Sequence, residues 1–125
     1  MPSFWKTVLF GALGVLCFDT LGATASRILG FRYGLLTIGT YIIYTFVSYK
    51  AGRQAGMAAA LTTGASLGLV DSTLGWAISW AIGPGRPSQA ISTVAIAVTC
   101  VFVIGLGAVL GLVGGVLARA IGAGR

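Results

Sequence analysis

Long runs without a charged residue constrain this chain more than any other feature. Residues Tyr33 to Tyr49, Gln54 to Val70 and Pro87 to Ala118 contain no Asp, Glu, Lys or Arg. A helix needs roughly 20 mostly apolar residues to cross the ~30 Å hydrocarbon core of a bilayer. Only 8% of the chain is charged, whereas soluble domains carry about 25%. The runs therefore predict an integral membrane protein built from α-helices.

The runs divide the 125 residues into four expected spans: Phe4 to Ala25, Tyr33 to Tyr49, Ala55 to Ile82 and Ala90 to Ala118. Short connections join them, and the last contains Pro84 and Pro87, which cannot continue a helix. We expect one transmembrane domain over residues 1–125, folded as an all-α, four-span helical bundle. The first span also resembles a cleavable signal peptide, but its similarity to a later segment argues against cleavage.

Basic residues indicate how the spans are oriented. One side carries Lys6, Lys50, Arg53, Arg119 and Arg125, and the other carries Arg27, Arg32 and Arg86. Because cytoplasmic loops are enriched in Lys and Arg, this bias predicts cytoplasmic termini in a bacterial-type cytoplasmic membrane. The net charge of +6 comes from scattered residues that form no run, so it does not indicate nucleic-acid binding.

Two stretches of the chain resemble each other. They are FDTLGATASRILG from Phe18 and DSTLGWAISWAIG from Asp71. Over these stretches and the residues just before them, a shift of 53 matches Gly11, Ala12, Leu16, Thr20, Leu21, Gly22, Ser26 and Gly30 with identical residues. This predicts two parallel two-helix repeats, in units 1–53 and 54–125, related by an axis along the membrane normal.

Small residues recur every four positions in three of the spans. The three series are Gly22, Ser26 and Gly30; Gly75, Ser79 and Gly83; and Gly107, Gly111 and Gly115. Such spacing lets a second helix approach closely, so we expect the first and third spans to touch. The series in the fourth span is compatible either with packing inside one chain or with a homo-oligomer interface.

Asp19 and Asp71 are the only acidic residues, and both fall inside expected spans. An ionised carboxyl there costs at least ~2.5 kcal/mol. Hydrogen bonds and a charge partner, for which Arg27 is the candidate, would offset that cost. Alternatively, the two acids form one central site that takes up a proton or a cation. From the expected span ends, Asp71 is the deeper of the two.

The second span contains a stripe of hydroxyl groups. Thr37, Tyr41, Tyr44 and Ser48 lie on one helical face at spacings of three and four residues. Hydroxyl groups in hydrocarbon need hydrogen-bond partners. The stripe either joins helices by hydrogen bonds or lines a hydrated path or a ligand site.

The residue inventory excludes most catalytic sites. Without histidine the chain lacks Ser/His and Cys/His pairs and the usual zinc ligands. The motifs of intramembrane aspartyl proteases, YD and GxGD, are also absent. We expect no enzyme, no metal and no cofactor.

Two functional hypotheses remain. The first is ion- or proton-coupled transport, or permeation, through the intramembrane aspartates. The second is a non-transporting assembly or regulatory subunit, or a holin-like pore former. The expected partners are the lipid bilayer and either further copies of the chain or a larger membrane complex.

Overall fold

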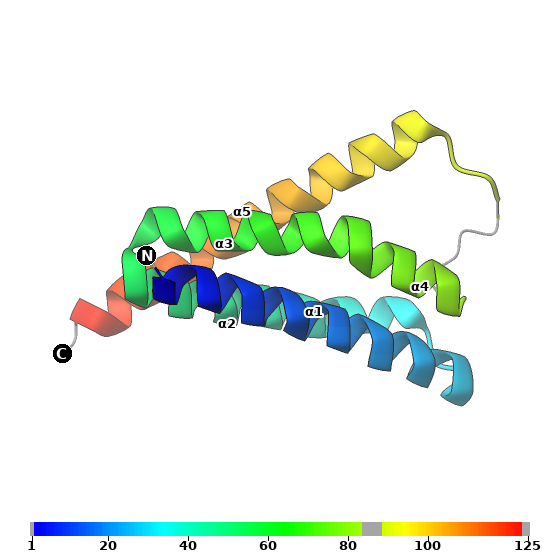
Figure 1. Cartoon of the computed structure of the whole chain (residues 1–125), viewed down its shortest axis with the longest axis horizontal. Helices are drawn as coiled ribbons and strands as arrows, with labels where there is room; N and C mark the ends of the chain where they lie inside the picture. The colour runs from blue at the N-terminus through cyan, green and yellow to red at the C-terminus, as the bar shows by residue number, and fades with distance from the viewer. Residues whose placement is uncertain (1, 84–88, 124–125) are drawn as a thin grey trace.

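The structure, a computed structural model, describes residues 2–83 and 89–123. Within these ranges 92% of the residues are helical, no strand occurs, and four helical passes lie against one another (Figure 1). The predicted all-α class and the four-helix arrangement are therefore confirmed. The turn predicted at Pro84 and Pro87 lies outside the described residues.

The first two passes are longer than expected. α1 (Pro2–Leu29) ends where Gly30 adopts φ +78°, and the Gly30 N–H donates to the Ser26 carbonyl at 2.9 Å. A short 3₁₀ turn, η1 (Tyr33–Leu35), leads into α2 (Leu36–Ala55). Both helices continue through basic residues, because Lys and Arg end an apolar run but are good helix formers.

The third pass is one helical rod with a local change of winding. A single residue, Gly56 at φ +89°, separates α2 from α3 (Met57–Val70). α3 continues through the π-helical turn η2 (Asp71–Gly75) into α4 (Trp76–Ile82). In this turn the Trp76 N–H is directed to the Asp71 carbonyl five residues earlier, whereas in an α-helix the acceptor is four residues earlier.

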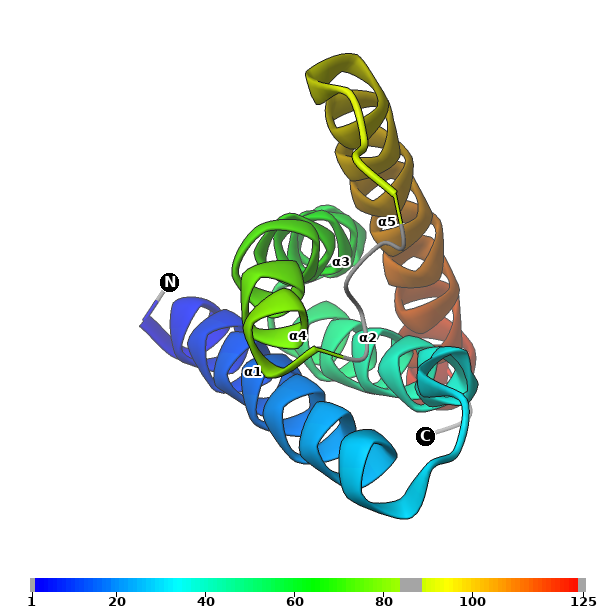
Figure 2. The same ribbon diagram turned by 90° about the vertical axis from the view of Figure 1, so that its right-hand side faces the viewer.

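The fourth pass, α5 (Thr93–Ala123), packs over only part of its length. Its C-terminal half lies against α2 and α3, while its N-terminal half diverges from the other helices (Figures 1 and 2). On the diverging half Val94, Val98 and Val101 are at least 63% exposed. α5 therefore presents a long apolar surface that no other described part of the chain covers.

The glycine ladder of α5 packs inside the chain. A Cβ at Gly64 of α3 would overlap the Gly107 carbonyl oxygen and would lie 2.8 Å from the Cα of Gly111. A Cβ at Gly115 would lie 3.0 Å from the Cβ of Ala60. The sequence left packing inside one chain and a homo-oligomer interface open for this ladder. In the structure the ladder packs inside one chain.

The small residues of the first and third passes do not all lie at the contact between these two passes. Gly22 lies against Leu36 of α2 and not against the third pass. α1 packs against both α2 and the third pass, and Gly22 is on the side that faces α2. Gly30 and Gly83 terminate helices at positive φ and are not packing residues within them. Gly75 lies next to Asp19 of the first pass, and Ser26 and Ser79 are buried, at 5% and 1% exposed. The repeat itself stays a prediction.

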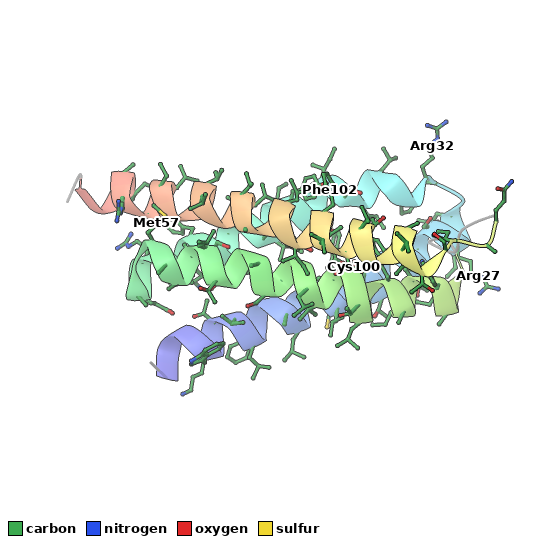
Figure 3. All side chains as sticks on the ribbon, turned by 90° about the horizontal axis from the view of Figure 1, so that it is seen from above. Arg27, Arg32, Met57, Cys100 and Phe102 are labelled. Carbon is green, nitrogen blue, oxygen red and sulfur yellow. The ribbon has the colours of Figure 1, made fainter. Side chains whose placement is uncertain are left out.

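The ends of the bundle carry different parts of the chain. Both termini lie at the same end as the Gly56 turn, near Met57, and Arg27 and Arg32 lie at the other (Figures 1 and 3). By length and composition two helical segments, Trp5–Leu29 and Thr93–Gly122, are suited to cross a membrane.

Candidate functional site

A cavity of about 200 Å³ lies in the half of the bundle where α5 diverges, and we name it the carboxyl cavity. Its polar lining consists of Asp19, Thr37, Thr40, Tyr41, Tyr44 and Asp71. Its apolar lining consists of Leu36, Trp76, Phe102, Val103 and Leu106. Each of the four passes contributes, so the cavity exists only in the assembled bundle.

The two aspartates meet in this cavity from different helices. Asp19 on α1 is only 5% exposed, and its Oδ2 atom is buried without a hydrogen-bond partner. The Asp71 carboxyl lies beside the Asp19 carboxyl, and both groups lie against Gly75. Two carboxyl groups can hydrogen bond to each other only when one of them carries a proton. The pair therefore suits a shared proton, or a cation bound between two carboxylates.

Gly75 makes room for this pair. A Cβ built on Gly75 would overlap Oδ2 of Asp19 and would lie 2.7 Å from Oδ1 of Asp71. Any larger residue would therefore force the carboxyl groups away from each other. The sequence pattern assigned Gly75 to helix packing. In the structure Gly75 also shapes the site that the two carboxyl groups form.

Asp71 is held by the π-helical turn and by a tyrosine. The Tyr44 hydroxyl donates to Oδ2 of Asp71 at 2.6 Å, and Tyr44 itself is 1% exposed. π-Helical turns inside α-helices occur frequently at functional sites. The Ser72 carbonyl in this turn accepts a weak hydrogen bond from the Cys100 thiol of α5, at 3.6 Å. Three passes thus fix the position of one carboxyl group.

The expected charge partner lies elsewhere. The Arg27 guanidinium donates to the Ile82 carbonyl at 2.5 Å, at the end of α4. It joins the ends of two helices, and no ion pair between it and either aspartate occurs among the described residues. Arg27 is exposed at the end of the bundle (Figure 3).

The hydroxyl stripe of α2 is divided between two environments. Thr37, Tyr41 and Tyr44 line the carboxyl cavity with the aspartates. Ser48 is fully buried beside Gly114 of α5, and its hydroxyl has no hydrogen-bond partner. The stripe therefore contributes three of its four predicted members to the cavity.

The two aspartates lie at similar distances from the end of the bundle that carries Arg27, whereas the sequence led us to expect Asp71 to be the deeper of the two. At ~1.5 Å per residue, Asp19 is about 15 Å from the end of α1 at Leu29. Asp71 is about 17 Å from the end of α4 at Ile82. The expected span ended too early, at Ala25, and this made Asp19 seem closer to the surface.

Sequence reasoning missed six cavity residues: Leu36, Thr40, Trp76, Phe102, Val103 and Leu106. Thr40 lies four residues before Tyr44, so the helical period contained a signal for it. The sequence contained no such signal for Trp76 and Phe102, because their placement depends on the π-helical turn and on the angle of α5. No protein-family model, curated protein or solved structure matches this chain.

Proposed function

We propose that this chain is a small four-span membrane protein in which the Asp19 and Asp71 pair binds and releases a proton or a small cation, as part of ion- or proton-coupled transport or permeation. The buried Asp19 carboxyl carries this proposal, because its Oδ2 atom has no hydrogen-bond partner unless a proton or a cation joins it to the adjacent Asp71 carboxyl. A purely structural carboxyl would be expected to have its hydrogen bonds satisfied.

The surface of the bundle supports placement of all four passes in a bilayer. Large apolar side chains are exposed on every pass, for instance Phe10 at 70%, Ile42 at 64%, Leu69 at 51% and Phe102 at 66%. Monomeric soluble proteins rarely expose contiguous apolar patches of more than a few hundred Å². α3, η2 and α4 together form one uninterrupted rod, although the π-helical turn divides it into shorter elements.

Competition between a proton and a cation for one carboxyl pair supplies the proposed coupling. With one proton shared, the pair carries a single negative charge and is internally hydrogen-bonded. Loss of that proton leaves two adjacent carboxylates, whose repulsion is relieved by a cation. Tyr44 donates to Asp71 throughout, so it keeps that carboxyl in position while the other changes partner.

Flux through purified protein in liposomes tests the proposal. We expect wild-type liposomes to dissipate an imposed pH gradient or cation gradient, as read by an enclosed pH-sensitive dye. Asp19→Asn and Asp71→Asn should each abolish the flux, because both carboxyl groups belong to one site at one depth. Thr62→Ala, an exposed hydroxyl on α3 outside the cavity, serves as the matched control and should retain it.

The folded state of each variant is read from its elution as a single species in detergent. Wild-type liposomes without flux, or Asn variants that are folded and fully active, would remove the transport proposal.

A second candidate function, as an assembly or regulatory subunit, is favoured by one observation. The N-terminal half of α5 stands apart from the other passes and exposes Val94, Val98 and Val101 (Figure 2). A partner helix in a larger complex would cover this surface. In that case Val98→Asn would shift the protein to a smaller species in native electrophoresis from mild detergent.

A further inference from the structure

A second hollow lies on the outer face of the bundle between α2 and α5. This outer groove has a volume of about 630 Å³. Two rows of α2 side chains form one wall, and Leu117 and Ile121 of α5 form the other. The wall residues are apolar or aromatic apart from one threonine, Thr45.

Each row of α2 runs along the groove at intervals of four residues and then reaches a cation. The first row is Ile38, Ile42 and Phe46, followed by Lys50, and the second is Tyr41, Thr45 and Tyr49, followed by Arg53. Residues four apart lie above one another on a helix. Each row thus ends at a cation one turn beyond its last wall residue. Neither cation lines the groove itself, and Lys50 also lines a separate hollow against α1.

Contacts in the structure attach these cations to the groove. The Lys50 ammonium lies 5.5 Å from the centroid of the Phe46 ring. The Arg53 guanidinium donates to the Tyr49 hydroxyl at 3.1 Å. The only acidic residues of the chain, Asp19 and Asp71, line the carboxyl cavity. The charge of Lys50 and Arg53 is thus left for a partner outside the chain.

The length of the groove matches one leaflet of a bilayer. From Ile38 to Lys50 the helix rises about 18 Å at ~1.5 Å per residue. Half of a ~30 Å hydrocarbon core is about 15 Å. An acyl chain anchored at the cations would thus extend along the whole groove.

We propose that the outer groove binds one anionic phospholipid, with an acyl chain along α2 and α5 and the phosphate at Lys50 and Arg53. A second copy of the chain fits less well, because a two-fold contact through this groove would bring four cations together. The inference rests on the membrane placement in the proposed function and is independent of transport. With cytoplasmic termini, the lipid belongs to the cytoplasmic leaflet, which is rich in anionic lipids.

Native mass spectrometry of the full chain in detergent measures this preference. The probes are dioleoyl-phosphatidylglycerol and dioleoyl-phosphatidylcholine in equal amounts, so that only the headgroup differs. We expect the wild type to retain the anionic lipid preferentially. Replacing Lys50 and Arg53 together by Gln should lower that preference about thirty-fold, since each cation near an anionic headgroup contributes about five-fold.

Two further variants separate the groove from general charge. Lys6→Gln with Arg32→Gln removes the same charge from α1 and from the opposite end of the bundle, and it should keep the preference. Thr45→Trp fills the groove and should reduce retention of the anionic lipid although both cations remain.

The outcomes decide between occupants. Equal loss of preference in the two double variants would overturn the proposal, as would unchanged retention in Thr45→Trp or displacement of the lipid by glycerol phosphate. A lipid-free wild-type dimer that Thr45→Trp dissociates would instead assign the groove to a second copy. Lipid retention needs no ion gradient, so a failure of transport leaves this result unaffected. Extraction of the chain without detergent would remove the membrane placement itself.

Discussion

Tyr44 is the residue on which the geometry of the carboxyl cavity depends most directly. Its ring belongs to the small core cluster with Val15, Val47 and Leu67, and its hydroxyl reaches Asp71. Packing therefore fixes the ring, and the fixed ring in turn positions the donor. A buried hydrogen bond to a charged group contributes more than one between neutral groups, roughly 1.5 to 3 kcal/mol.

Tyr44→Phe is expected to lower the stability of the bundle by about 1 to 3 kcal/mol, because it leaves a carboxyl oxygen of Asp71 without its donor. The thermal midpoint in detergent measures this effect. Tyr41→Phe is the matched control, since Tyr41 lines the same cavity but its side chain is 36% exposed. An equal loss in both variants would contradict the special role of the Tyr44 hydroxyl.

Much of the site was predictable at the residue level, and the reason is chemical. Asp19 and Asp71 stand out because an acid in hydrocarbon is costly, and Thr37, Tyr41 and Tyr44 stand out through helical spacing. The hydrogen-bonded pairing of Tyr44 with Asp71 was not predictable, because it depends on how two helices are rotated against each other. For Arg27 the sequence suggested a carboxyl partner, yet the nearest acceptor is a helix-end carbonyl.

Among the helices, the contact between α3 and α5 is the closest approach of two backbones. Gly64 and Gly68 of α3 face Gly107, Gly111 and neighbouring backbone atoms of α5. No side chain separates the two helices at this crossing. Van der Waals contact between backbones, which dominates helix association in lipid, therefore holds the C-terminal half of α5 in place.

Gly64→Ala should separate α3 from α5, because its Cβ would overlap the Gly107 carbonyl oxygen. We expect a lower thermal midpoint or failure to accumulate, a loss of about 1 to 3 kcal/mol as for other overpacked positions. Gly105→Ala is the control, since a Cβ there meets open space and alanine favours the helix by up to about 1 kcal/mol. Tolerance of Gly64→Ala would show that the helices are not in contact here.

Element boundaries were less predictable than element number. The apolar runs indicated four helices because each run is long, and the structure has four passes. Their ends were misplaced, since a helix continues through Lys and Arg until a glycine at positive φ stops it. The π-helical turn at Asp71 had no signal, because it depends on contacts with α1 and α5.

For the molecule as a whole, the main feature is that its two ends differ in charge and in connections. The end with the termini and Gly56 carries Lys6, Lys50, Arg53 and Arg119 on described helices, and the opposite end carries Arg27 and Arg32 (Figure 3). The carboxyl cavity lies in the half toward the second end, while the cations of the outer groove lie at the first.

We expect the end with the termini to be cytoplasmic, because it holds more basic residues. Reporter fusions active on only one side of the membrane check this, one joined to the C-terminus and one inserted at Ala90. The two should give opposite results, with the C-terminal fusion cytoplasmic. Identical sidedness would contradict four complete spans, and a reversed pair would place the lipid groove in the other leaflet.

The single-residue turn at Gly56 has a consequence for how the chain enters a membrane. A single residue joins α2 to the third pass, and the Tyr44 to Asp71 hydrogen bond lies between them. We expect the two to insert together as a helical hairpin, in which the tyrosine shields the acid from lipid before α5 arrives. The bundle would then assemble first from α2 and the third pass. α1 would pack later and bring the carboxyl of Asp19 next to that of Asp71.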